Sequence, residues 1–122
     1  MELISLKTRI TTSRLEETMA WYRDLLGLEV AEQWNEPDDR GCILALPGGA
    51  GEALLEIYER PASAGLADLS LQFRVADVDA FRPPDEPRFA SRGPVDRPWG
   101  SRYLFFTDPN GIVVVLFSGR SL

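Results

Sequence analysis

The sequence predicts an α+β fold built from two similar halves, each with the order strand, helix, strand, strand, strand. The first half contains a strongly periodic helix pattern, and the second half repeats the same order of elements after a short segment at residues 61–66. The chain then closes with a β-hairpin signal at Asp108-Pro109-Asn110-Gly111. A repeat of about sixty residues indicates a duplicated module and not a solenoid. We expect one domain over residues 1–122, with modules at about 1–60 and 67–122.

The first half opens with a mixed apolar and polar run at residues 2–11, which we expect to be a strand. Ser13 and Glu16 have capping-box spacing, so Ser13 is the predicted N-cap of the following helix. The helix is predicted from apolar residues at helical spacing, and Gly27 stands at the position of a left-handed C-cap. Three further strands are predicted at residues 28–34, 41–46 and 53–58.

The second half begins with an alternating strand at residues 69–75, followed by a short helix from Asp77 to Phe81. Pro83 and Pro84 end that helix. The last three strands are predicted at residues 88–94, 103–106 and 112–117.

The composition excludes several kinds of chemistry. The chain has no histidine and one cysteine, which excludes Ser/His and Cys/His nucleophilic sites, any histidine metal site and a thiolate cluster. A metal site built from carboxylates alone stays open from the composition. A net charge of −6 argues against nucleic acid and against an anionic membrane surface as partners, and it is compatible with a cationic ligand. A single cysteine is typical of the reducing cytoplasm, where we expect the protein to be located.

Three segments carry a resemblance to a known family. They are Trp21-Tyr22-Arg23-Asp24-Leu25-Leu26-Gly27-Leu28-Glu29-Val30, the segment Phe73–Asp79, and Arg97-Pro98-Trp99-Gly100-Ser101-Arg102-Tyr103-Leu104-Phe105-Phe106-Thr107-Asp108-Pro109-Asn110-Gly111. With them the chain resembles the vicinal-oxygen-chelate superfamily, which includes glyoxalase I, extradiol dioxygenases and the bleomycin-resistance proteins. The resemblance implies two βαβββ modules that form a cup-shaped mixed sheet around a ligand cavity, with the helices on the outer face. It also implies a homodimer with cavities at the subunit interface.

The resemblance further implies where metal ligands would stand. In the metal-dependent members, four inward positions on the first and last strand of each module carry His or Glu. Here these positions are Lys7, Glu56, Ser70 and Val115, and only Glu56 has useful ligand chemistry. We therefore expect neither a metal nor another cofactor, as in the metal-less bleomycin-resistance branch.

Strand alternation then predicts which side chains line the cup. Residues that share a face with the four positions include Arg9, Tyr58, Gln72 and Phe117. The opposite set is apolar and should pack under the helices: Leu6, Ile10, Leu55, Ile57, Leu69, Leu71, Phe73, Val114 and Leu116. The predicted ligand-binding residues are Lys7, Arg9, Trp34, Glu56, Tyr58, Ser70, Gln72, Trp99, Tyr103, Val115 and Phe117.

Some of these side chains allow two interpretations. Glu56 beside Lys7 is either a general base, or an anchor for a cationic group, or half of a structural ion pair. Trp99 stands in a loop, where an aromatic side chain has less core to fill, so we expect it to contact ligand. Arg102 is expected in a surface salt bridge, and Cys42 as an inert core thiol.

Three functions remain open from the sequence. The preferred one is a metal-independent protein that binds a small organic molecule, such as an antibiotic or another natural product, without turnover. The second is a metal-independent lyase or isomerase that uses Glu56. The third is a non-catalytic structural domain whose cup is filled by its own side chains.

Overall fold

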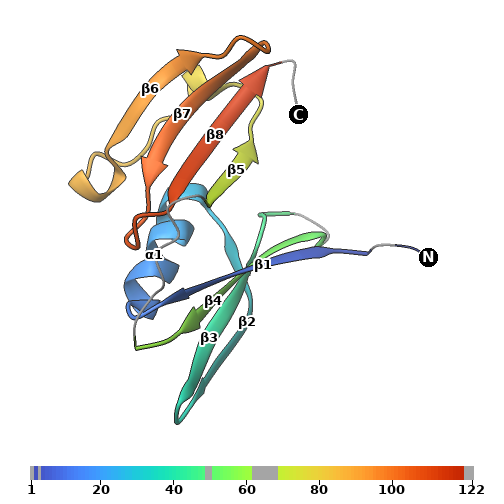
Figure 1. The fold of residues 1–122 in the computed structure, drawn as a ribbon, viewed down its shortest axis with the longest axis vertical. Coiled ribbons are helices and arrows are strands. Elements are labelled where there is room, and N and C mark those ends of the chain that lie inside the picture. Colours follow the sequence, from blue (N-terminus) through green and yellow to red (C-terminus); the bar gives the residue numbers. More distant parts are fainter. Residues whose placement is uncertain (1, 3, 49–50, 62–68, 120–122) are drawn as a thin grey trace. The chain divides into compact units, whose positions relative to one another are not determined.

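The structure, a computed structural model, describes residue 2 and residues 4–48, 51–61 and 69–119. The chain divides into two compact units, Met1–Ala64 and Gly65–Leu122. Each unit contains one four-stranded mixed sheet (Figure 1). Together they are the two βαβββ modules of the predicted α+β fold, with a short 3-10 turn replacing the second helix. The predicted linker at residues 61–66 lies, beyond residue 61, outside the described residues, and the cup-shaped joining of the two sheets stays a prediction.

The described residues of the first unit form four strands and an α-helix. Its elements are β1 (Leu6–Thr12), α1 (Leu15–Leu26), β2 (Glu29–Glu36), β3 (Asp39–Ala45) and β4 (Ala53–Glu59). The strand order is β1-β4-β3-β2, with β1 parallel to β4 and the other neighbours antiparallel. The apolar side of α1 packs on β3 and β4.

The core of this unit lies between α1 and one face of its sheet. The helix buries Leu15, Thr18, Trp21, Tyr22 and Leu25, and the sheet buries Ile10, Thr12, Cys42, Leu44, Leu55 and Ile57 beneath them. The predicted burial of Leu6 is wrong, because this side chain is 71% exposed. It stands at the first position of the edge strand β1, and α1 packs on the two inner strands instead.

The start of α1 differs from the prediction, whereas its end agrees. Arg14, not Ser13, is the N-cap, and its side chain makes no capping hydrogen bond. The Oγ1 atom of Thr12 instead accepts a hydrogen bond from the backbone N of Arg14 at 2.8 Å. This shift moves Glu16 one position too early for a capping box, and its carboxylate pairs with Arg40. Gly27 has the left-handed conformation of a C-cap, with φ 70°.

The second unit has the same strand topology with two 3-10 turns. Its elements are β5 (Ser70–Arg74), η1 (Val78–Ala80), η2 (Pro87–Phe89), β6 (Ser91–Asp96), β7 (Ser101–Thr107) and β8 (Val113–Gly119). The order is β5-β8-β7-β6, with β5 parallel to β8. The prediction that a strand begins at Arg88 is wrong, because Pro87 fixes a 3-10 turn there and β6 begins at Ser91.

The closing hairpin forms as predicted. Oδ1 of Asp108 accepts hydrogen bonds from the backbone N of Asn110 at 2.7 Å and of Ile112 at 2.9 Å. Gly111 has φ 83°, which a glycine adopts without strain. The turn thereby fixes β7 against β8 over Ser101–Thr107 and Val113–Gly119.

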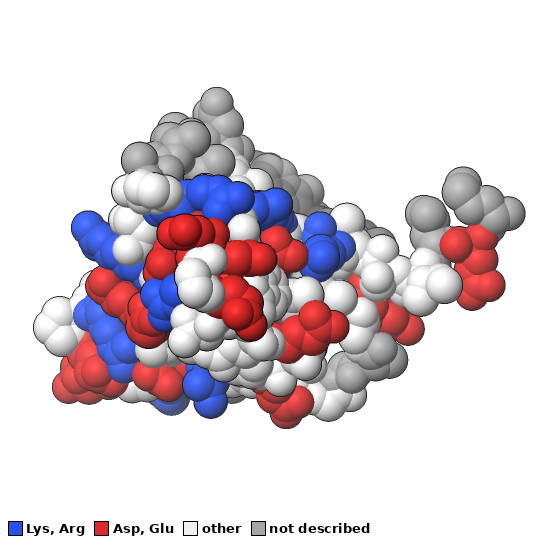
Figure 2. All heavy atoms as spheres, turned by 90° about the horizontal axis from the view of Figure 1, so that it is seen from below, with Lys and Arg blue, Asp and Glu red and all other residues white. Residues whose placement is uncertain are grey.

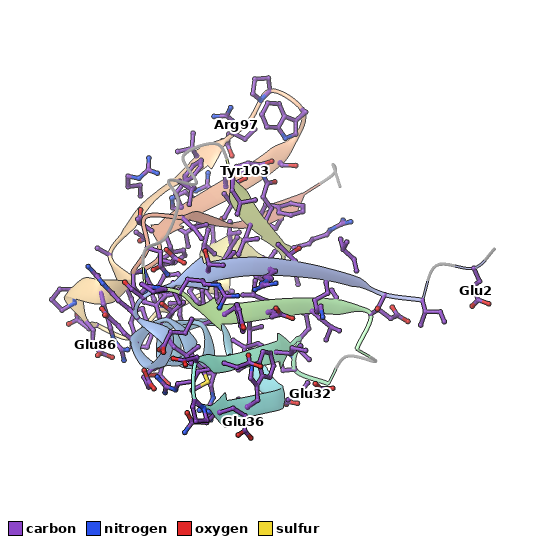
Figure 3. The ribbon with its side chains drawn as sticks, turned by 60° about the horizontal axis from the view of Figure 1, so that its bottom comes forward. Glu2, Glu32, Glu36, Glu86, Arg97 and Tyr103 are labelled. Carbon is purple, nitrogen blue, oxygen red and sulfur yellow. The ribbon has the colours of Figure 1, made fainter. Side chains whose placement is uncertain are left out.

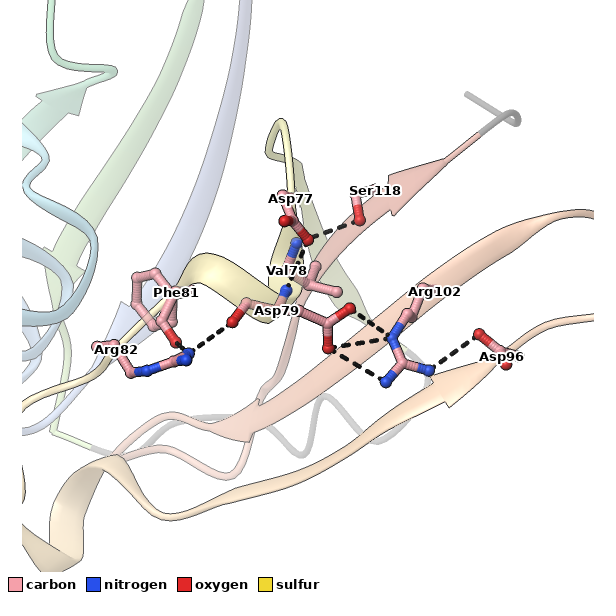
Figure 4. A network of polar contacts seen from close by, with 8 residues as sticks. All are labelled: Asp77, Val78, Asp79, Phe81, Arg82, Asp96, Arg102 and Ser118. Carbon is pink, nitrogen blue, oxygen red and sulfur yellow. Dashed lines mark hydrogen bonds and ion pairs between the residues drawn. The ribbon is translucent and has the colours of Figure 1, made fainter.

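A network of polar contacts joins η1 to strands of the second sheet (Figure 4). Asp77 caps η1 by accepting from the backbone N of Asp79. Arg102 reaches the carboxylate of Asp79 at 2.9 Å and that of Asp96 at 3.0 Å. The predicted salt bridge of Arg102 is therefore confirmed.

No helix among the described residues is long and apolar enough to cross a membrane.

Candidate functional site

The candidate site residues lie on the sheet faces that do not carry α1 or η1. On the first sheet, Glu56 forms the predicted ion pair with Lys7, at 3.1 Å from its Oε1 atom. Its other oxygen lies 3.2 Å from Nε of Arg9, which stands directly opposite Glu56 in the ladder between β1 and β4. The Glu56 side chain is 12% exposed, whereas both cationic side chains are nearly half exposed. A buried carboxylate is thus held between two cations.

The residues at the four expected metal-ligand positions do not suit a metal ion. Both oxygens of Glu56 lie beside positive charges, which would repel a divalent cation. The hydroxyl of Ser70 is a weak metal ligand, and the side chain of Val115 has no donor atom. In the described part of the chain, no group of three or more His, Cys, Asp or Glu side chains could hold a metal. The metal chemistry found in part of the family does not fit the residues present here.

The two aromatic residues predicted to bind ligand on the first sheet contact each other. Trp34 and Tyr58 have ring centroids 6.3 Å apart, and both donate hydrogen bonds to Oδ1 of Asp39, at 3.0 Å and 2.8 Å. The guanidinium groups of Arg9 and Arg60 lie over the Tyr58 ring, 4.1 Å and 4.0 Å from its centroid. The Tyr58 ring is therefore already occupied by cation–π contacts.

The second sheet presents four neighbouring rings on one face, which we call the aromatic face: Trp99, Tyr103, Phe105 and Phe117. Tyr103 is at its centre, with centroids 5.8 Å from Trp99, 5.8 Å from Phe105 and 5.9 Å from Phe117. Trp99 meets Tyr103 edge to face and is 47% exposed, so much of its indole is free to contact another molecule. The structure thus brings together three predicted residues and adds Phe105.

Polar groups line one side of the aromatic face. The Tyr103 hydroxyl donates to Oε1 of Gln72 at 3.3 Å, and Nε2 of Gln72 donates to Oγ of Ser70 at 3.2 Å. Val115 is buried between its ladder partners Gln72 and Phe105. Ser70, Gln72, Tyr103 and Val115, all among the predicted ligand-binding residues, therefore share one surface.

Two arginines that the sequence analysis did not single out also lie on this face. The guanidinium of Arg97 lies over Trp99, 4.7 Å from its centroid, and 5.7 Å from the centroid of Tyr103. Figure 3 shows Arg97 beside Tyr103, on the segment that leads from β6 to β7. Arg92 lies over Phe105 at 4.9 Å. Alternation along β7 could have found Phe105, but nothing local marks Arg92 or Arg97.

Charge is divided unevenly between the two units. Residues 1–64 hold 12 of the 19 acidic and 6 of the 13 basic residues, so they carry the whole net charge of −6. Residues 65–122 hold 7 of each and are neutral. On the face of the molecule shown in Figure 2, acidic and basic side chains are intermingled. The overall acidity therefore does not describe the aromatic face.

Comparison with solved structures places this fold among related proteins. TnmS3, described as an antibiotic binding protein from Streptomyces sp. CB03234, matches with a TM-score of 0.75 at 24% identity, over 95% of each chain. A member of the glyoxalase superfamily from Sphaerobacter thermophilus DSM 20745 gives a TM-score of 0.73 at 21% identity, over 93% of this chain and 95% of that one. A glyoxalase/bleomycin resistance protein from Streptomyces sp. CB03234 gives 0.68 at 25% identity, over 92% and 97%.

The sequence itself matches a family profile. Residues 5–83 match the profile of the Glyoxalase/Bleomycin resistance protein/Dioxygenase superfamily, and this range includes the first module and the start of the second. No curated protein matches the sequence. The predicted family is thereby confirmed, and the chain belongs to the Glyoxalase/Bleomycin resistance protein/Dioxygenase superfamily.

Proposed function

We propose that this protein binds a small organic molecule without a metal and sequesters it, with an antibiotic or another natural product as the ligand. The observation that carries the proposal is the aromatic face, where half-exposed Trp99 stands edge-on to Tyr103 in a loop. Each ring stacked on a flat ligand contributes about 0.5–1.5 kcal/mol beyond the apolar area that it buries. Several such contacts around one ligand add to the free energy of binding.

The structural relatives support this proposal. TnmS3 is described as an antibiotic binding protein, and its fold matches 95% of this chain at 24% identity. At that identity the likeness shows the fold alone, so the ligand has to be inferred from the residues of this chain. The aromatic face supplies stacking surface, and Ser70, Gln72 and Tyr103 supply hydrogen-bonding groups beside it. This mixture is typical of small-molecule sites.

A lyase or isomerase that uses Glu56 is less well supported. A general base needs an oxygen that can reach the substrate proton. Here one oxygen of Glu56 pairs with Lys7 and the other with Arg9. This arrangement favours the structural interpretation of the carboxylate over the catalytic one.

The experiment combines native mass spectrometry, elemental analysis and calorimetry on protein purified without added metal. We expect a metal-free homodimer that retains a small molecule or binds a flat aromatic probe, 2-naphthamide, with a chelator present and without chemical change to the probe. Trp99→Ala should weaken that binding about tenfold, because one stacking contact is lost. Stoichiometric zinc, nickel, iron or manganese would contradict metal independence. A protein that neither retains a small molecule nor binds the probe would favour the structural-domain alternative.

A further inference from the structure

We infer that the aromatic face selects planar aromatic molecules that carry an acidic oxygen, such as an aromatic carboxylate or an ionised phenol, and that Arg97 binds this oxygen. The inference rests on the proposed function, since it names the ligand class of the same face. It runs against the simplest expectation from a net charge of −6, which would be a cationic ligand.

Three arginines of the described second unit lie on the aromatic face. Arg74 shares the face with Gln72 by alternation along β5, while Arg92 and Arg97 lie over its rings. The four strands of this sheet contain one carboxylate, Asp96. Its side chain points to the opposite face, where it accepts a hydrogen bond from Arg102. Three guanidinium groups therefore share this face with no carboxylate from the strands.

Arg97 and Arg92 differ from the arginines that have structural roles. Arg9, Arg40, Arg88 and Arg102 each pair with a carboxylate. Within the described residues, Arg97 and Arg92 have no carboxylate partner and are held by cation–π contacts alone. The Nε atom of Arg97 is also buried without a hydrogen-bond partner. A partly desolvated, unpaired guanidinium is a favourable site for an anion.

The geometry explains why the anion should be attached to a flat ring. The Arg97 guanidinium lies 4.7 Å from the centre of the half-exposed Trp99 indole. A ligand ring that stacks on the free part of that indole brings an attached carboxylate close to the guanidinium. The planar fork of arginine can then donate two parallel hydrogen bonds to the carboxylate while it stays stacked on the indole. A cationic substituent at the same position would be repelled.

The test is a charge series measured by isothermal titration calorimetry on the full chain. The probes are 2-naphthoate, 2-naphthamide and 2-naphthyltrimethylammonium, which share one ring system and differ in charge. We expect the carboxylate to bind at least about tenfold more tightly than the amide, and the ammonium probe to bind most weakly. Arg97→Gln should remove most of the preference for the carboxylate over the amide.

A matched control and a second variant make the result specific. Arg88 also stacks on a ring, Phe89 at 4.4 Å, but it is paired with Glu86, so Arg88→Gln should keep the full preference. Arg97→Lys retains the charge but not the planar fork and should give an intermediate preference. If the Arg97 variants fail to fold, the charge series on the unaltered protein still decides whether the face prefers an anionic ligand.

The outcomes separate the two proposals. Binding of the amide or the ammonium probe as tightly as the carboxylate would overturn the inference and leave the proposed function standing. A preference for the carboxylate that survives Arg97→Gln would overturn the role of Arg97. Failure of all three probes to bind would overturn the proposed function, and the inference with it.

Discussion

The indole of Trp34 lies so close to Gly41 on the neighbouring strand that no larger residue fits beneath it. A Cβ atom at position 41 would lie 2.6 Å from Cζ2 of Trp34 and 2.8 Å from the carbonyl oxygen of Ile57. The same indole donates to Asp39 on β3, which also accepts from Tyr58. Trp34 is thereby fixed within the first sheet, which leaves the second sheet as the better surface for a ligand.

Gly41→Ala should lower the free energy of unfolding by about 1–3 kcal/mol, because the added methyl group overpacks this site. The free energy is measured by urea denaturation at pH 7. In the Trp34→Ala background the same change should cost less, since the indole contact is gone, although the clash with Ile57 remains. An unchanged unfolding midpoint in both backgrounds would show that the indole does not rest on Gly41.

Glu56→Gln should lower the free energy of unfolding by about 1 kcal/mol, because it leaves Lys7 and Arg9 without their shared counter-charge. The loss is limited because both cations are nearly half exposed and regain water. Binding of 2-naphthamide should not change. Glu32→Gln, a change at an exposed carboxylate on β2, is the control and should leave stability unaltered. Loss of a chemical activity with Glu56→Gln would instead support the enzyme alternative.

The ion pair between Glu16 and Arg40 should make stability depend on pH in the acidic range. The hydrogen bond from Arg40 lowers the pKa of Glu16 from its ordinary value of 4.5. The folded state therefore gains stability that is present above about pH 4.5 and is lost as the pH falls through the lowered pKa. Because the Glu16 side chain is 66% exposed, the gain is about a few tenths of a kcal/mol.

The check is urea denaturation of Glu16→Gln at pH 7 and at pH 3. The variant should be less stable than the unaltered protein at pH 7 and closer to it at pH 3. Glu17→Gln, which removes the same charge from the same helix turn, should show a smaller difference at pH 7. Equal effects of the two substitutions would show that the pair with Arg40 contributes nothing.

Cys42 should be almost unreactive toward thiol reagents in the folded protein. The side chain is fully buried, and burial raises the pKa of the thiol from 9.0 to about 11. At pH 8 only about one thiol in a thousand would be ionised, and the thiolate is the reactive form. Labelling with a chromogenic disulfide should be at least about a hundredfold slower than in urea-unfolded protein. Equally fast labelling would contradict the core position.

Prediction from the sequence was most accurate for features that depend on residues close together along the chain. The turn at Asp108 and the C-cap at Gly27 follow from local backbone chemistry, and both are confirmed. Strand alternation correctly placed Gln72 on the same face as Ser70. Local signals failed at the start of α1, where Glu16 pairs with Arg40, a residue 24 positions away, in preference to a capping box.

The contacts that the sequence could not predict join different strands and loops. The shared acceptor Asp39 holds Trp34 and Tyr58 only because β2, β3 and β4 are adjacent in the sheet. Arg97 lies over Trp99 because the segment between β6 and β7 folds back, which residue type alone does not reveal. Site prediction therefore depended on strand register, and only the structure placed Arg92 and Arg97 on the aromatic face.

Chemical-shift mapping tests the central claim most directly. The full ¹⁵N-labelled chain is titrated with 2-naphthoate, first without and then with a chelator, and backbone amide shifts are followed. We expect the largest changes at the segment from Arg97 to Phe105 and at Phe117, with small changes around the ion pair of Lys7 and Glu56. Changes centred on that ion pair, or changes that disappear when the chelator is added, would contradict a metal-independent ligand site on the aromatic face.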